Sequence, residues 1–203
     1  MGGREGRFEG RPIVGWSALA LLSMAAILLA AYGTEEAGVR VLIRATARTS
    51  LPLFLAAFVA SSARRLWRSD TTAWLLRNRR YVGVSFATSH GVHLAAIVTL
   101  AARWPESFWS KTSPLTLYGG GLGYVFIFLL ALTSSDAAVR RLGRQRWKLL
   151  HTIGVWYLFG IFLLNYGPSG FFSPAYIPAS LAVLTALGLR IAARWRVAGR
   201  VPA

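Results

Sequence analysis

The chain has 203 residues, of which 55% are hydrophobic and 15% are charged, and its formal net charge is +16. In a soluble domain this charge would suggest a nucleic-acid-binding surface, but the apolar content is too high for an ordinary soluble domain. Disorder is excluded as well, because disordered chains are polar and poor in aromatic residues. The absence of cysteine excludes disulfides, thiolate zinc sites, iron–sulfur clusters and cysteine nucleophiles. We therefore interpret the chain as a membrane protein in contact with the lipid bilayer, with its positive charge in the loops and no nucleic-acid partner.

Six stretches are long and apolar enough to cross a bilayer, which takes about 20 residues of helix. They cover residues 13–32, 41–60, 81–102, 115–133, 148–166 and 175–192. The first is longer than the apolar run of a secretory signal peptide, about 7–15 residues, and we interpret it as a span. The sequence thus predicts an all-α, polytopic six-helix membrane bundle that forms a single domain over residues 1–203, without a soluble catalytic domain.

Basic residues predict the orientation of this bundle. The connections on one side hold only Arg103 and Lys111, beside three glutamates. Under the positive-inside rule, the opposite side, which contains both termini, is therefore predicted to be cytoplasmic. Residues 64–80 mix arginine with leucine and tryptophan, and we expect them to lie along the inner membrane surface or to form a solvated basic loop. The eighteen basic residues of the predicted cytoplasmic side are Arg4, Arg7, Arg11, Arg64, Arg65, Arg68, Arg77, Arg79, Arg80, Arg140, Arg141, Arg144, Arg146, Lys148, Arg190, Arg194, Arg196 and Arg200.

All three histidines fall inside predicted spans, where ionisable groups are costly and usually functional. His90 and His93 share one face of the third span, and His151 lies in the fifth. Imidazole is a ligand for haem iron, zinc and copper. A haem b with two axial ligands takes one imidazole from each of two facing helices, whereas three histidines without a thiolate or carboxylate make a poor zinc site. Depth counted at about 1.5 Å per residue favours His90 over His93 as the partner of His151.

The spans contain no Asp or Glu away from their ends, and this affects two interpretations. It argues against a permease coupled to protons or sodium. It also leaves Arg40, Arg44 and Arg48, which form one stripe of the second span, without an acidic partner inside a span. Arg40 can reach the outer interface, but Arg48 cannot easily do so. We expect Arg48, with Arg44, to face a bound ligand: haem propionates, the phosphate of a flavin such as FMN, or a quinone oxygen. The alternative is a structural arginine bonded to helix-end carbonyls.

Three motifs resemble the ferric-reductase-like transmembrane domain superfamily. The second span reads Thr46-Ala47-Arg48-Thr49-Ser50-Leu51, the third enters through Arg79-Arg80-Tyr81-Val82-Gly83 and continues to His93, and the fifth follows Thr133-Ser134, Leu142-Gly143 and Trp147-Lys148-Leu149-Leu150-His151. The likeness covers nearly the whole chain. Within the superfamily it is strongest to the haem-binding membrane subunits of bacterial periplasmic methionine-sulfoxide reductase systems.

The resemblance implies a haem b bound by His93 and His151 in a bacterial inner-membrane protein, and His90 is kept as an alternate ligand. Members with two haems carry a further histidine where this chain has Leu164, so the resemblance implies one haem. Electrons are expected from the quinone pool, a bound flavin or a separate cytosolic reductase, and they would pass to a periplasmic redox partner protein. The chain would then be the electron-transfer subunit of an oxidoreductase. The competing hypothesis is a non-redox membrane protein, such as a permease or assembly partner, whose histidines pack between helices.

Overall fold

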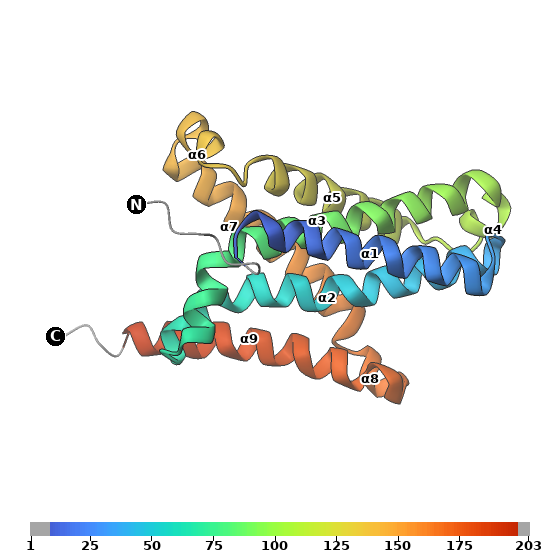
Figure 1. Ribbon diagram of the computed structural model, residues 1–203. Coiled ribbons are helices and arrows are strands. Elements are labelled where there is room, and N and C mark those ends of the chain that lie inside the picture. Colours follow the sequence, from blue (N-terminus) through green and yellow to red (C-terminus); the bar gives the residue numbers. More distant parts are fainter. Residues whose placement is uncertain (1–8, 199–203) are drawn as a thin grey trace.

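The computed structural model describes residues 9–198, which form a bundle of helices (Figure 1). Arg4, Arg7 and Arg200 of the basic set lie outside these residues. Within the described part there is no strand, and six helices are long and apolar enough to cross a membrane, as predicted. These are α1 (Arg11–Tyr32), α2 (Glu36–Leu66), α3 (Asp70–Arg103), α5 (Pro114–Leu132), α7 (Arg144–Tyr166) and α9 (Ile177–Ala198). The short elements between them are α4 (Pro105–Trp109), α6 (Asp136–Leu142), α8 (Ser169–Phe172) and the 3₁₀ turn η1 (Pro174–Tyr176).

The connection between α2 and α3 is much shorter than predicted. Only residues 67–69 separate the two helices. The Ser69 side chain accepts a hydrogen bond from the backbone N–H of Thr72, and the Thr72 hydroxyl accepts one from the backbone N–H of Ser69. This reciprocal cap begins α3 at Asp70 rather than at residue 81. The alternative of a solvated loop over residues 64–80 is therefore wrong. The segment is helical on both sides of the break, and Figure 1 shows the first turns of α3 crossing the end of the bundle.

α2 is the central helix and packs along α3, α1 and α9, whereas α7 packs against α5 and α9. Small residues allow the α5–α7 approach. A Cβ atom on Gly154 would lie 3.0 Å from a ring carbon of Phe126 and 3.1 Å from a methyl of Leu130, and one on Gly123 would lie 3.0 Å from a methyl of Ile161.

Aromatic side chains fill the space between α7 and the α2–α3 pair. Phe58 of α2 stacks on Phe159 of α7 with ring centroids 4.4 Å apart, and Phe54 stacks on Phe162 at 4.9 Å. Phe86 of α3 joins the same buried cluster. Five helices, α2, α3, α5, α7 and α9, contribute to this core, which occupies the middle of the bundle.

The two ends of the bundle differ in charge. We call the end with the α1–α2 turn and α4 the α4 end, and the opposite end, with α6 and the α2–α3 turn, the α6 end (Figure 1). Ion pairs join the basic segments at the α6 end: Arg77 lies 3.1 Å from Glu9, and Arg80 lies 3.0 Å from Asp136. Arg196 of α9 donates to the Leu66 carbonyl at 3.0 Å. The described members of the basic set thus gather at one end, as predicted. Which side of the membrane this end faces remains a prediction.

Candidate functional site

His93 of α3 is held by one ring nitrogen. Its Nδ1 lies 2.9 Å from Oγ1 of Thr46 on α2. The Thr46 hydroxyl is itself fully buried and lies 2.8 Å from the Leu42 carbonyl of its own helix. Among the described residues, Nε2 of His93 has no hydrogen-bond partner. The ring is therefore oriented from one side and has a free nitrogen on the other.

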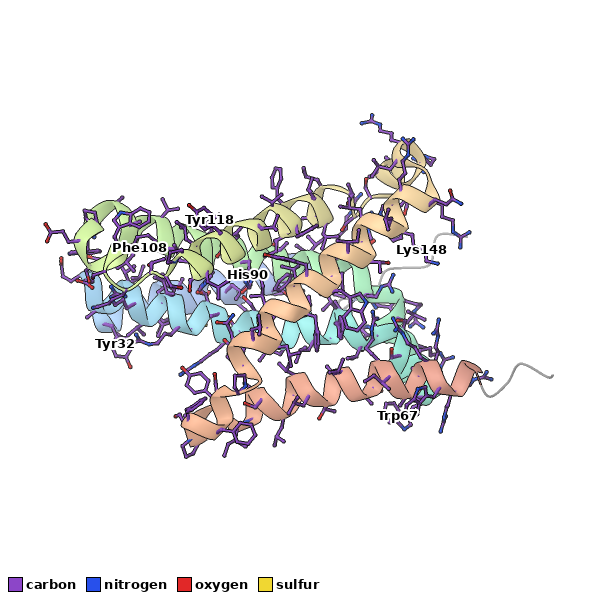
Figure 2. All side chains as sticks on the ribbon, turned by 180° about the vertical axis from the view of Figure 1, so that it is seen from behind. Tyr32, Trp67, His90, Phe108, Tyr118 and Lys148 are labelled. Carbon is purple, nitrogen blue, oxygen red and sulfur yellow. The ribbon has the colours of Figure 1, made fainter. Side chains whose placement is uncertain are left out.

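His90 lies one turn before His93, in the middle of the bundle (Figure 2). The ring centroids of the two imidazoles are 5.5 Å apart. His90 also packs against Phe86 at 4.6 Å, Tyr124 of α5 at 5.8 Å and Phe162 of α7 at 6.0 Å. Its Nδ1 and the hydroxyl of Tyr124 are buried and lack a hydrogen-bond partner within the described part of the chain. Such orphaned buried atoms are rare in native proteins, and a redox role or a bound ion is among their explanations.

His151 lies in a different environment near the start of α7. Its Nε2 is 2.9 Å from Oγ1 of Thr133, which follows the last residue of α5. The Trp147 ring stacks on the imidazole with centroids 4.2 Å apart, and its Nε1–H donates to the Thr133 carbonyl at 2.9 Å. Gly143, with φ of 75°, makes the turn that begins α7. The Trp147–His151 motif therefore builds the corner between α5 and α7.

The histidines of α3 and α7 lie at different levels of the bundle. His90 is level with Tyr124 on α5, whereas His151 contacts Thr133, nine positions further along the chain. This corresponds to about 13 Å of helix. Along α7, Phe162 beside His90 and His151 are eleven positions apart, or about 16 Å.

This offset is large compared with what one metal ion needs. An imidazole nitrogen bonds a metal at about 2 Å, so two nitrogens on opposite sides of one iron lie about 4 Å apart. The structure brings His90 and His93 together and places His151 nearer the α6 end. Within residues 9–198 no three His, Asp or Glu side chains converge on one point, so a closed zinc site is not formed either.

The three arginines of the α2 stripe have different surroundings. Arg40 donates to Glu36 at 2.7 Å and to the Ser107 hydroxyl at 3.0 Å. The expectation that it lacks an acidic partner is therefore wrong, because Glu36 lies one turn earlier on the same helix. Arg44 and Arg48 are exposed and have no carboxylate partner among residues 9–198.

Arg44 and Arg48 also face away from the histidines. Thr46 and Ser50 of α2 bond to α3 side chains. Arg44 and Arg48 each lie two positions from Thr46, which places them about 200° around the helix from it. The Arg48 guanidinium lies 5.5 Å from the centre of the Tyr176 ring in η1. The backbone of α2 thus separates both guanidiniums from His93.

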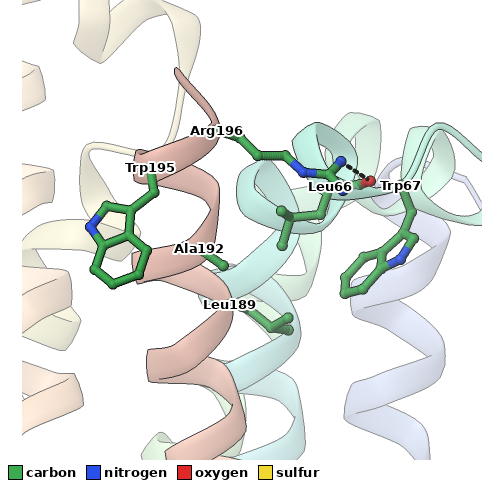
Figure 3. Close-up of a pocket in the computed structure, with 6 residues that line it drawn as sticks. All are labelled: Leu66, Trp67, Leu189, Ala192, Trp195 and Arg196. Atoms are coloured by element: carbon green, nitrogen blue, oxygen red, sulfur yellow. Dashed lines mark hydrogen bonds between the residues drawn. The ribbon is translucent and has the colours of Figure 1, made fainter. Parts of the chain in front are cut away.

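A surface groove lies between the α6 ends of α2 and α9 (Figure 3), and none of its lining residues is a histidine. Next to this region, Arg190 donates to the Phe58 carbonyl at 3.1 Å and covers the Trp156 ring at 5.1 Å. The groove is lined by Leu66, Trp67, Leu189, Ala192, Trp195 and Arg196.

Sequence reasoning missed the residues that orient the imidazoles. In the sequence Thr46 stands out only as part of a motif, because its contact with His93 depends on α3 lying beside it. The contact of Thr133 with His151 likewise joins residues 18 positions apart, which the motif does not reveal. For Tyr124, nothing local in the sequence shows that its hydroxyl faces the bundle interior. A hydroxyl residue in the middle of an apolar span is the one signal that could have singled out Thr46.

Comparison with known proteins agrees with this architecture. Residues 43–162 match the family described as ferric reductase like transmembrane component. Similar proteins include the protein-methionine-sulfoxide reductase heme-binding subunits MsrQ of Ralstonia nicotianae, 31% identical over 75% of this chain and 71% of the relative, and of Rhodospirillum rubrum, 30% identical over 75% and 74%. The MsrQ of Azospira oryzae is 36% identical over 38% of this chain and 34% of its own length. No solved structure matches.

Proposed function

Because the chain belongs to the ferric reductase like transmembrane component family, we propose that it is a haem b-binding electron-transfer subunit of the bacterial inner membrane. The relatives are named as heme-binding subunits of a protein-methionine-sulfoxide reductase. The observation that carries the proposal is the pair of imidazoles of His90 and His93 inside a bundle of membrane-spanning helices.

The side chains around this pair fit a haem ligand set. His93 offers a nitrogen that no other group engages, and His90 contains a buried nitrogen without a partner. Leaving a buried polar atom unsatisfied costs about 1–3 kcal/mol, and a bound group that engages it would remove this cost. When bound, a haem supplies one-electron redox chemistry, at a potential tuned by its axial ligands and their hydrogen bonds.

We rank the proposed iron ligands by their surroundings. His93 is first, because its ring is oriented and one nitrogen is free. His90 is the alternate ligand on the same face of α3. The resemblance also implies His151, but this imidazole uses Nε2 for Thr133 and lies about 13–16 Å of helix away from the level of His90. His151 therefore enters the proposal as a ligand near the α6 end rather than as an established partner of His93.

Arg44 and Arg48 are proposed to bind an anion or a polar oxygen. Two exposed guanidiniums without a carboxylate are costly at membrane depth, so an anionic group is expected to cover them. Because α2 lies between them and His93, they suit the phosphate of FMN or a quinone oxygen better than the propionates of a haem at His93. Arg48→Gln should weaken binding of FMN or of a quinone analogue, and Arg103→Gln, at the exposed α4 end, is the matched control.

The basic α6 end is proposed to face the cytoplasm, as the positive-inside rule predicts. Electrons would enter there from a bound flavin or a cytosolic reductase, or from the quinone pool within the membrane. They would leave toward a periplasmic redox partner protein at the α4 end. The methionine-sulfoxide reductase named in the relatives indicates the class of that partner.

The test is the reduced-minus-oxidised visible spectrum of the purified protein from cells with adequate haem supply. A sharp haem b band is expected, which His93→Ala should abolish or strongly reduce and which His90→Ala should perturb. Leu94→Ala, next to His93 on the exposed side of α3, is the matched control and should keep the band. A folded wild-type protein that binds no haem would overturn the proposal.

One observation favours the competing non-redox function. The contacts of His151 with Thr133 and Trp147 account for this histidine as a packing residue at a helix corner. If all three histidines have only this role, the purified protein is colourless. The three single alanine variants would then change thermal stability without any spectral effect.

A further inference from the structure

Thr46 of α2 contacts the His93 ring through its hydroxyl, and the Ile43 carbonyl beside it also faces this imidazole. Its Oγ1 lies 2.8 Å from the Leu42 carbonyl, 3.0 Å from the Ile43 carbonyl and 2.9 Å from Nδ1 of His93. A hydroxyl has one proton to donate and a carbonyl oxygen can only accept. When the proton goes to a carbonyl of its own helix, as is usual for a buried helical threonine, the Thr46 oxygen remains as an acceptor.

From this geometry we propose that Thr46 is a positioning residue that holds His93 with its proton on Nδ1. The nitrogen–hydrogen group of His93 then donates to Oγ1 of Thr46, and the lone pair of a neutral imidazole lies on Nε2. A nitrogen must present a lone pair to bind a metal. Thr46 would thus prepare His93 to bind haem iron through Nε2, and this inference rests on the proposed function.

The same reasoning gives His151 the opposite arrangement. The Thr133 hydroxyl lies 2.6 Å from the Leu129 carbonyl and 2.9 Å from Nε2 of His151. With the hydroxyl proton on the carbonyl, His151 donates from Nε2 and keeps its lone pair on Nδ1. Thr46 and Thr133 therefore set two imidazoles of one chain in different tautomers, and of these two only His93 presents the lone pair of Nε2.

A hydrogen bond to the second nitrogen of a ligating histidine also raises the basicity of the ligand, and its loss typically weakens metal binding about 10–100-fold. Thr46→Val keeps the shape of the side chain but removes the acceptor, and Thr46→Ser keeps the acceptor. Thr49→Val is the matched control, because among the described residues the Thr49 hydroxyl bonds only to the Ala45 and Thr46 carbonyls of its own helix.

Two measurements test the proposal. The first is ¹⁵N NMR of histidine-labelled protein prepared without haem, with the His93 signals assigned by their loss in His93→Gln. Wild type, Thr46→Ser and Thr49→Val should carry the His93 proton on Nδ1, and Thr46→Val should show a mixture of tautomers. A wild-type proton on Nε2 would overturn the proposal, whether or not the protein binds haem.

The second measurement is haem titration with redox potentiometry. Thr46→Val should weaken haem binding about 10–100-fold and raise the midpoint potential, because a less basic ligand stabilises ferric iron less. Thr46→Ser should restore both values. Unchanged affinity and potential in Thr46→Val would refute the positioning role. Absence of haem from the wild type would instead refute the proposed function and leave the tautomer result to stand by itself.

Discussion

Replacing His151 should leave the iron at His93 in place, and this prediction follows from the different levels of the two residues. His90, one turn from His93, contacts Tyr124 of α5 and Phe162 of α7. Along α5, Tyr124 lies about 13 Å from Thr133, which contacts His151, and along α7, Phe162 lies about 16 Å from His151 itself. One iron with two axial imidazoles needs nitrogens about 4 Å apart. In this structure the contacts of the two residues therefore place them at levels that do not suit a shared iron.

The assay is haem content per chain, with the visible spectrum and the redox titration curve, for wild type, His93→Ala and His151→Ala. His93→Ala should lose the haem of the α3 site, and His151→Ala should retain it with an unchanged midpoint potential. Loss of the Thr133 contact in His151→Ala should cost about 0.6 kcal/mol, a typical value for a hydrogen bond between membrane helices. His151→Gln, which can still bond Thr133, controls for this loss.

One outcome would refute the reasoning. If the wild type holds one haem per chain, and His93→Ala, His151→Ala and His151→Gln each lose all of it while remaining folded, then the two histidines share that iron. The pairing implied by the family resemblance would then be correct. α7 would have to lie further along the bundle in the haem-bound protein than it does here.

Two further predictions concern packing and orientation. Gly154→Val should destabilise the protein by about 1–3 kcal/mol through overpacking, because the new side chain meets Phe126. Gly160→Val should cost less, because no atom lies within 4 Å of a Cβ added there. Thermal unfolding in detergent compares the two variants, and equal losses of stability would contradict the close α5–α7 contact. Because the chain contains no cysteine, single introduced cysteines report the orientation. Ser110→Cys at the α4 end should react with an impermeant maleimide added to the periplasmic side, and Gln145→Cys at the α6 end should not. The reverse labelling pattern would show the opposite orientation.

Local features of the sequence predicted a large part of the fold. The lengths of the apolar stretches identified all six spanning helices, and the basic connections identified one common end. Hydropathy alone does not show the start of α3, because its opening turns over residues 70–80 are rich in polar and basic side chains, although the pair Ser69 and Thr72 is a readable helix start. The ion pair of Arg40 with Glu36 was readable too, from a spacing of four residues on one helix.

The candidate site was predicted less completely. The resemblance selected His93, but it could not show that Thr46 orients the ring, because the two residues lie 47 positions apart in the chain. Nor could it show that α2 stands between Arg48 and His93. That relation depends on which face of α2 meets α3, and the arginine stripe of α2 does not tell which neighbouring helix its opposite face will contact.

By itself the sequence determined what the bilayer selects: how many helices cross, where their charges gather, and which metal-binding side chains lie between the ends. These properties depend on the transfer of each segment from water to lipid, which is local in the chain. The tertiary structure decided which side chains meet. The level of His151 against His90, and the hydroxyl that holds His93, depend on lateral packing and on the rotation of each helix about its axis. Those are set by side chains far apart in sequence, because lipid is as apolar as the helices and provides no direction of its own.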